Sequence, residues 1–161
     1  MVDQLCIAYR IGDATAPVGA GPRVVTHICN DVGGWGAGFV LALSNRWPDP
    51  EAAYKRWFEG REQNDFELGA VQMVQVEDDI WVANIVGQRG ITPSADGPPI
   101  CYPAVESGLS FVAERAQEMA ASVHMPRMGV GLGGGDWVTV ETIVDATLIA
   151  EGIEVTVYDL P

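Results

Sequence analysis

The amino-acid sequence predicts an α/β fold in which a mixed β-sheet carries helices on both faces. Segments with the apolar runs of buried strands alternate along the chain with segments of helical apolar spacing. Only Glu77-Asp78-Asp79 separates the strand-like segments 71–76 and 80–86, which predicts a hairpin and therefore one antiparallel pair. Strands that alternate with helices, together with one hairpin, imply a mixed sheet covered on both sides.

Six segments have the apolar or β-branched runs of strands. The clearest is the buried-type segment 24–29, which leads to Asn30 and to a glycine-rich stretch. Before it, a turn at Gly12-Asp13-Ala14-Thr15 and a loop rich in proline and glycine over 16–23 separate the first two strands. The expected strands are residues 5–9, 24–29, 71–76, 80–86, 122–128 and 154–158.

Four segments have the apolar spacing of amphipathic helices. Pro48 ends the first, and Asp49-Pro50-Glu51 opens the second as an N-cap, a proline at the first helical position and a first-turn acid. A proline-rich loop over 87–100 precedes the third helix, and loops of this length in compact domains are often functional. The expected helices are residues 38–47, 49–59, 102–121 and a last one around 140–148.

The length of 161 residues predicts one domain, residues 1–161, with a substantial core. The formal net charge of −13 argues against a nucleic-acid binder or a protein that binds anionic membranes, because both need a basic surface. A small anionic ligand is compatible with this charge if backbone dipoles rather than lysines hold it. Taken by itself, the charge is explained more simply by a role in solubility alone. No membrane association is expected, since the apolar runs are too short to span a bilayer.

The three cysteines, Cys6, Cys29 and Cys101, are odd in number and widely spaced. No disulfide framework is therefore expected, and a reducing compartment is favoured. No basic region precedes a sustained apolar run at the N-terminus, so we expect no signal peptide and predict a cytoplasmic protein. His27 and His124 form no ligand-spaced cluster with the cysteines. We accordingly expect no metal site and interpret both histidines as core or sheet-edge residues.

Two glycine-rich stretches each join a strand to a helix. A strand, a glycine loop and a helix N-terminus together form an anion site, because glycine lets the backbone approach a phosphate and the free N–H groups of the first helical turn point at it. Two such loops predict a diphosphate held from both sides, whereas plain tight turns would leave most of the glycines without a role. The stretches are Gly33-Gly34-Trp35-Gly36-Ala37-Gly38 and Gly129-Val130-Gly131-Leu132-Gly133-Gly134-Gly135-Asp136.

The chain resembles the macrodomain family of ADP-ribose-binding modules over nearly its whole length. The most specific part of the resemblance is 125–137, which is similar to the branch that contains terminal ADP-ribose glycohydrolases. The resemblance implies a three-layer α/β/α sandwich with a central mixed sheet, and ADP-ribose as the diphosphate. The matching segments, in order, are Gly12-Asp13-Ala14-Thr15, the strand ending in Asn30, Asn84-Ile85-Val86-Gly87-Gln88, Met125-Pro126-Arg127-Met128-Gly129-Val130-Gly131-Leu132, and Val157-Tyr158.

The same resemblance implies roles for individual side chains. Asp13 would accept a hydrogen bond from the adenine amino group beside the backbone of Ala14, although Asp13 would equally serve to cap a turn. Asn30 would orient the hydroxyls of the distal ribose, a position that also suits a simple strand-end residue. Tyr158 would lie against the adenine or ribose, although an aromatic residue at a strand end is more often part of the core.

Backbone groups would make the remaining ligand contacts that the resemblance implies. The first loop would surround the distal ribose and one phosphate, and the second would hold the diphosphate from the other side. The residues concerned are Gly33, Gly34, Trp35, Gly36 and Ala37 in the first loop, Gly87, and Gly129, Val130, Gly131, Leu132, Gly133, Gly134 and Gly135 in the second.

The resemblance does not extend to the catalytic residues of the terminal ADP-ribose glycohydrolases. Those enzymes use a lysine after the strand that corresponds to 81–86, where this chain has Gly87 and Gln88. They also use an acid in the second glycine loop, where this chain has Gly133. The only lysine, Lys55, lies in an expected helix away from the loops. A mechanism through a lysine adduct is therefore not expected.

Hydrolysis by another route would depend on Gln88 and Asp136. If the bond to be cleaved is an ester to a glutamate or aspartate side chain, the leaving carboxylate has a pKa of about 4 and departs without strong acid assistance. Gln88 would then orient a water, and Asp136 would act as a base or through its field, as in glycoside cleavage. Alternatively, Asp136 only caps the next helix and Gln88 is a solvated loop residue.

The two glycine loops, together with the resemblance to the glycohydrolase branch, therefore imply a hydrolase that removes mono-ADP-ribose from acidic side chains of modified proteins, without metal or organic cofactor. ADP-ribose and mono-ADP-ribosylated proteins are the expected partners, and the chain is expected to act as a monomer. Two alternatives stay open: a non-catalytic reader of ADP-ribose, and a deacetylase or phosphatase that acts on ADP-ribose metabolites such as O-acetyl-ADP-ribose. The same site would serve all three functions.

Overall fold

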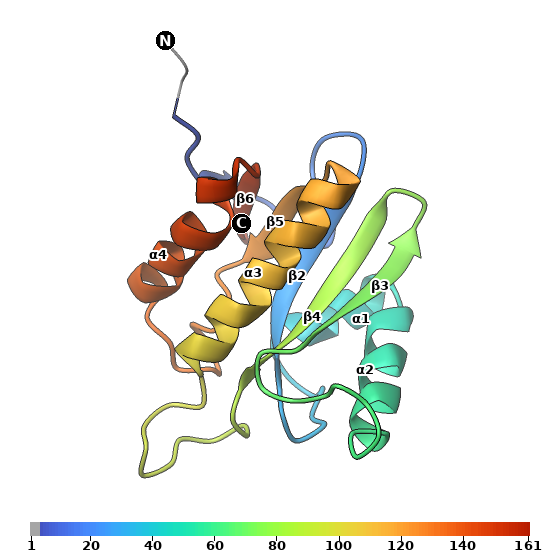
Figure 1. Cartoon of the computed structure of the whole chain (residues 1–161), viewed down its shortest axis with the longest axis vertical. Coiled ribbons are helices and arrows are strands. Elements are labelled where there is room, and N and C mark those ends of the chain that lie inside the picture. The colour runs from blue at the N-terminus through green and yellow to red at the C-terminus, as the bar shows by residue number, and fades with distance from the viewer. Residues whose placement is uncertain (1–3) are drawn as a thin grey trace.

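A six-stranded mixed sheet forms the centre of the molecule (Figure 1). The computed structural model describes residues 4–161. Across the sheet the strand order is β1-β6-β5-β2-β4-β3, and only β3 runs antiparallel to its neighbour, β4. The predicted mixed sheet and the hairpin are thereby confirmed. The strands are β1 Ala8–Ile11, β2 Arg23–Asn30, β3 Val71–Glu77, β4 Ile80–Gln88, β5 Ser122–Pro126 and β6 Val155–Asp159.

Helices cover both faces of this sheet, so the predicted three-layer α/β/α sandwich is confirmed. Figure 1 shows α3 and α4 on one side of the sheet and α1 and α2 on the other. A short 3-10 turn, Ile149–Glu151, connects α4 to β6. The helices are α1 Phe39–Arg46, α2 Asp49–Glu59, α3 Tyr102–Met119 and α4 Trp137–Thr147. No helix within residues 4–161 is both long enough and apolar enough to span a bilayer.

The sheet separates two apolar clusters because successive strand side chains point to opposite faces. On β2, Val24 packs in the cluster of α3 and α4, whereas the next residue, Val25, packs in the cluster of α1 and α2. Leu109 of α3 belongs to the first cluster and Tyr54 of α2 to the second, and both are fully buried. Alternation along a single strand thus assigns a helical layer to each face.

Parallel pairing determines where the two glycine loops lie. β2 pairs in parallel with β5 on one side and with β4 on the other. Their carboxyl ends, at Asn30, Pro126 and Gln88, therefore meet at one edge of the sheet. In register, Asn30 lies beside Gln88. Since one glycine loop follows β2 and the other follows β5, both begin at this edge, which is the usual ligand-binding edge of open α/β sheets.

The structure differs from the expected elements mainly at their ends. β1 begins at Ala8 rather than at residue 5, because its parallel pairing with β6 starts at Ala8 and Thr156. Cys6 consequently lies before the first strand and is exposed. α2 has Pro48, not Asp49, as its N-cap, because the Pro48 carbonyl accepts the first intrahelical hydrogen bond, from the Ala52 N–H at 3.3 Å.

The contact between α3 and the sheet depends on Gly108. A Cβ atom at this position would lie 2.4 Å from Cγ2 of Ile85, which is fully buried on β4. Overpacking of a filled core costs about 1–3 kcal/mol. We therefore expect Gly108→Val to lower the free energy of unfolding by about that amount in a urea titration. Ser110→Val, at an exposed position of the same helix, should change it by less than about 0.5 kcal/mol; equal losses in the two variants would contradict this account.

Candidate functional site

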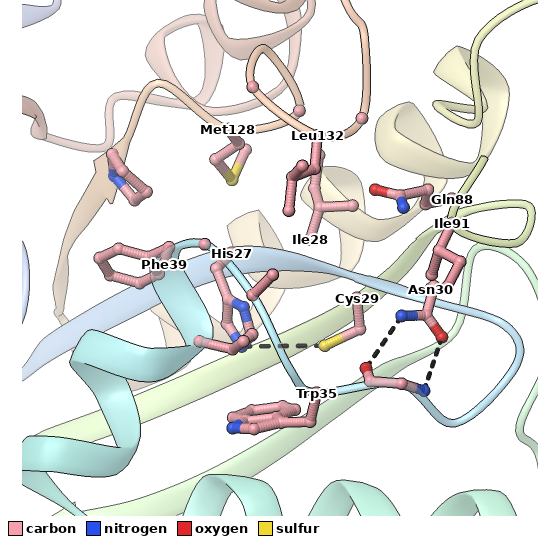
Figure 2. A pocket seen from close by; sticks show the side chains of 18 of the residues that line it. His27, Ile28, Cys29, Asn30, Trp35, Phe39, Gln88, Ile91, Met128 and Leu132 are labelled. Carbon is pink, nitrogen blue, oxygen red and sulfur yellow. Dashed lines mark hydrogen bonds between the residues drawn. The ribbon is translucent and has the colours of Figure 1, made fainter. Parts of the chain in front are cut away.

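A cleft of about 440 Å³ opens at the edge of the sheet where the two glycine loops meet. Figure 2 shows Leu132 on one side of the cleft and Trp35 on the other, with Gln88 and Ile91 towards one end and Met128 and Phe39 towards the other. The residues predicted from the sequence that line the cleft are Asn30, Gly34, Trp35, Gly36, Ala37, Gln88, Gly129, Gly131, Leu132 and Gly133. Both loops therefore contribute to a single cavity.

The first loop is shaped by the side chain of Asn30. Its Oδ1 atom accepts hydrogen bonds from the N–H groups of Val32 and Gly34, both at 3.0 Å, and its Nδ2 atom donates to the Gly34 carbonyl at 2.9 Å. The Tyr54 hydroxyl donates to the Asn30 carbonyl at 2.7 Å and accepts from the Gly33 N–H at 3.1 Å. Asn30 thus holds the loop in place.

Beyond this turn, residues of the loop that line the cleft have backbone amides that no described residue accepts from. Within the described residues, the N–H groups of Gly36 and Ala37 donate no hydrogen bond. Gly38, the N-cap of α1, has φ of 82°, a left-handed conformation that glycine adopts without strain. A Cβ atom at Gly36 would have no other atom within 4 Å, so the backbone there faces open space. Amides at a helix N-terminus form a suitable site for an anion.

The second loop folds back on itself and presents amides from the opposite side. Its ends are joined by the Gly135 N–H, which donates to the Gly129 carbonyl at 2.7 Å. A Cβ atom at Gly133 would lie 2.8 Å from the same carbonyl oxygen, so only glycine fits there. In the described part of the chain, the N–H groups of Gly131 and Leu132 have no hydrogen-bond acceptor.

The two loops approach each other closely. A Cβ atom at Gly38 in the first loop would lie 3.6 Å from Cδ1 of Leu132 in the second. Leu132 is nevertheless 63% exposed, so its side chain overhangs the cleft rather than filling a core position. The loops therefore form two opposing walls lined by backbone donors.

A hydrogen bond fixes the orientation of the Gln88 side-chain amide at this cleft. Its Nε2 atom donates to the Gly90 carbonyl at 3.0 Å. Its Oε1 atom lies towards the second loop, 3.2 Å from the position of a Cβ atom on Gly133. The end of the amide that is free to interact with a bound molecule is therefore the hydrogen-bond acceptor.

Arg127 is a cleft residue to which the sequence analysis assigned no role. Among the described residues that line the cleft, it is the only one that carries a charge. Its Nε and Nη2 atoms donate to the carboxylate of Asp159 at 2.7 and 3.0 Å, and its guanidinium lies 5.1 and 5.4 Å from the ring centres of Tyr9 and Trp137. The hydrogen bond to Asp159 raises the pKa of Arg127, which keeps the guanidinium charged. Its place in the segment 125–132 was the available sequence signal.

His27 and Cys29 line the inner part of the cleft and were also missed. The His27 Nε2–H donates to Asn84 Oδ1 at 2.5 Å, whereas Nδ1 has no partner among the described residues. Burial lowers the pKa of His27 to about 4, so the imidazole is neutral at pH 7. Burial also raises the pKa of the Cys29 thiol, which leaves it protonated and a poor nucleophile. Across residues 4–161, no three His, Cys, Asp or Glu side chains are placed to hold a metal ion.

Several predicted site residues lie outside the lining of the cleft. Asp13 accepts hydrogen bonds from the N–H and hydroxyl of Thr15, both at 2.8 Å, as an acid in a turn does. Tyr158 is 5% exposed and its hydroxyl accepts from the Val18 N–H at 3.0 Å. Ligand contacts by these residues stay predictions. The residues that do not line the cleft are Asp13, Ala14, Gly33, Gly87, Val130, Gly134, Gly135, Asp136 and Tyr158.

Asp136 lies at the N-cap of α4, exposed to solvent. Its backbone N–H donates to the Tyr102 hydroxyl at 2.9 Å, and its Oδ2 atom accepts from the Thr139 hydroxyl at 3.0 Å. Within the described residues, its carboxylate caps no backbone N–H of the helix. Its catalytic role is an untested prediction.

Comparison with solved structures shows close similarity over the whole fold. A protein of unknown function from Bacteroides thetaiotaomicron is 53% identical, with a TM-score of 0.94 over 98% of this chain and 100% of that one. A macrodomain protein from Streptomyces coelicolor is 54% identical, with a TM-score of 0.86 over 95% of this chain and 98% of that one. DarTG from Thermosipho africanus in complex with ADP-ribose is 22% identical, with a TM-score of 0.67 over 86% of this chain and 38% of that one.

Among curated proteins, the Chromodomain-helicase-DNA-binding protein 1-like of Danio rerio is 29% identical over 97% of this chain. The chain spans only 16% of the length of that protein. No family model matches the chain.

The neutral state of His27 makes a prediction about stability and pH. Its pKa is about 4 in the folded protein and about 6.5 when unfolded, so the unfolded chain binds more protons between these values and acidification favours unfolding. In His27→Gln this contribution is absent. From pH 6.5 down to pH 4, the parent should lose about 1.4 kcal/mol of unfolding free energy per pH unit through His27, and the variant should not. The difference between variant and parent should therefore grow by about 1.4 kcal/mol for each pH unit of acidification. Urea titrations across this range measure the difference, from which the titration of carboxylates cancels; a constant difference would contradict a neutral His27.

Proposed function

This chain belongs to the macrodomain family, and we propose that its cleft binds ADP-ribose and that the protein removes mono-ADP-ribose from acidic side chains of modified proteins. One observation carries the proposal: two loops with unpaired backbone amides face each other across one cleft. Its volume of about 440 Å³ falls within the range of about 300–1,000 Å³ found for small-molecule sites. A structurally similar protein, DarTG, has been solved with ADP-ribose.

Backbone amides account for diphosphate binding by a protein with a net charge of −13. The amides of Gly36 and Ala37, before α1, and of Gly131 and Leu132, opposite, offer donors without a long cationic side chain. Arg127 adds a guanidinium that Asp159 holds in a fixed orientation, and the Asp159 carboxylate balances its charge. The apolar lining by Phe39, Met128 and other side chains would cover the sugar and base carbons.

The chemistry that this cleft supports is restricted by the groups it lacks. Its described lining includes neither a carboxylate nor a lysine, so no ionised side chain is in place as a general base or as a nucleophile. A reaction there requires a leaving group that departs without protonation, and a carboxylate of pKa about 4 satisfies this. We therefore propose esters of glutamate and aspartate as substrates rather than amide-like or ether-like linkages.

In this mechanism a water attacks the anomeric carbon of the distal ribose. The new C–O bond forms as the bond from this carbon to the ester oxygen breaks, the carboxylate leaves with the electron pair, and the water proton passes to solvent. Gln88 Oε1, the free acceptor in the cleft, orients the water by accepting a hydrogen bond from it. The modified protein is the proposed partner. We also propose a cytoplasmic location, which the free thiols of Cys6, Cys29 and Cys101 support.

A non-catalytic reader of ADP-ribose is the second candidate. The observation that favours it is the same absence of lysine and carboxylate among the described lining residues. A reader would bind ADP-ribose through the same amides and leave a modified glutamate unchanged. Incubation with a glutamate-ADP-ribosylated protein separates the two: released ADP-ribose supports the hydrolase, whereas retained label together with ADP-ribose binding supports the reader.

Gly36→Glu tests the ligand site. The new side chain has space at Gly36, so the fold should persist, but it places a negative charge where the diphosphate is proposed to bind. We expect ADP-ribose binding to weaken at least about 100-fold in calorimetric titrations, because like charges at close range oppose each other in a partly enclosed site. Ala20→Glu adds the same charge at an exposed position outside the cleft and should bind as the parent does. Equal affinity of Gly36→Glu and parent would exclude this cleft.

Gln88→Ala tests the proposed orientation of the water. Loss of the acceptor should reduce kcat for release of ADP-ribose by about 10- to 100-fold, while Kd for ADP-ribose changes by less than about threefold. Gln75→Ala, at an exposed position on β3, serves as the matched control. Asp136→Ala is measured alongside; its exposed side chain caps no backbone N–H of α4 and does not line the cleft, so the variant should change stability by less than about 0.5 kcal/mol and keep the parent's rate. Full turnover by Gln88→Ala would remove Gln88 from the mechanism.

A further inference from the structure

Behind Gln88, three hydrogen bonds form a closed ring with Asp31 and Gly90. The Gln88 Nε2 atom donates to the Gly90 carbonyl at 3.0 Å. The Gly90 N–H donates to Asp31 Oδ1 at 2.8 Å, and the Asp31 N–H donates to the Gln88 carbonyl at 3.0 Å. Asp31 directly follows β2, so the ring connects the ends of two neighbouring parallel strands.

This ring determines which end of the Gln88 amide faces the cleft. A carbonyl oxygen can only accept a hydrogen bond, so the Gly90 carbonyl requires the NH₂ end of Gln88. Oε1 is then directed away from Gly90, towards the second glycine loop. If Gly90 moved, the amide would be free to turn and present its NH₂ group to the cleft. An NH₂ group cannot accept a hydrogen bond from water or from a hydroxyl group.

Packing does little to hold Gly90 in place. A Cβ atom there would have no other atom within 4 Å, and φ of Gly90 is +64°, in the left-handed region. The adjacent Arg89 N–H donates to the Pro99 carbonyl at 2.8 Å, which secures the chain on one side. On the other side, the N–H of Gly90 itself is held by the Asp31 carboxylate, and a hydrogen bond to an ionised acceptor is stronger than one to a neutral acceptor.

We propose that Asp31 is a positioning residue for the reaction: by fixing Gly90 it makes Gln88 present Oε1 to the bound substrate. Asp31 itself is not among the residues that line the cleft, and it acts only through Gln88. The inference deepens the proposed function and rests on it for its kinetic consequence, whereas the geometry of the ring can be measured without any turnover.

The kinetic test is a double-mutant cycle with glutamate-ADP-ribosylated protein as substrate. Asp31→Ala should reduce kcat by about 10- to 100-fold with little change in Kd for ADP-ribose. Asp31→Asn retains an Oδ1 acceptor for the Gly90 N–H and should restore most of the rate. Asp31→Ala combined with Gln88→Ala should be no slower than Gln88→Ala alone, because the two residues act through one group. Additive losses, or a loss in Asp31→Asn equal to that in Asp31→Ala, would overturn the proposal.

A second measurement separates failure of the proposal from failure of the proposed function. Amide hydrogen exchange at Gly90, followed by NMR, should be slow in the parent and in Asp31→Asn and fast in Asp31→Ala. Asp145→Ala, an exposed acid on α4, is the control for general destabilisation. A parent that binds ADP-ribose without turnover overturns the hydrolase and the positioning role with it, and the exchange data then decide only whether Asp31 holds Gly90 in place. Rapid exchange of Gly90 in the parent would overturn the ring itself.

Discussion

The parallel pairing of β2 with both β5 and β4 is the constraint on which the site depends. Each glycine loop supplies only half of a binding surface, and the halves begin about a hundred residues apart in the chain. Side-by-side strands of the same direction bring Asn30, Gln88 and Pro126 to one edge, so the loops that follow β2 and β5 face each other. Burial of Val24, Val25 and Val123 holds those strands together from both faces.

The chemistry of the cleft follows from its being lined mainly by backbone groups rather than by charged side chains. Donors come from the main chain, the sole charged group among the described lining residues is Arg127, and the inner histidine is neutral. Such a site suits recognition of a phosphate-bearing ligand better than proton transfer. The proposed substrates are accordingly those whose leaving group needs no proton. The acceptor proposed to orient the water is the amide oxygen of Gln88.

Local patterns in the sequence predicted much of this structure, and non-local contacts set the remainder. Apolar alternation located the strands and the hairpin, but the start of β1 depends on where β6 begins, about 150 residues later. Glycine content identified both loops, because these positions require glycine. Gly38 has a positive φ, and at Gly133 a Cβ atom would collide with the Gly129 carbonyl oxygen. The sequence could not show that Gln88 is oriented by Asp31 or that Arg127 is held by Asp159, because those pairs meet only after folding. Asp136 illustrates the reverse case, in which proximity in sequence to a loop did not bring a side chain into the cleft.

Walls made of main-chain amides have a consequence for how this protein tolerates change. An amide donor cannot be deleted by exchanging one side chain for another, except by proline. Substitutions at Leu132 or Trp35 would alter the contours of the cavity while leaving its donors in place, whereas a single methyl group at Gly133 would collide with the Gly129 carbonyl. In related chains we therefore expect many different residues at the bulky positions that line the cleft. We expect little variation at positions such as Gly133, where the backbone packs directly against the backbone of another residue.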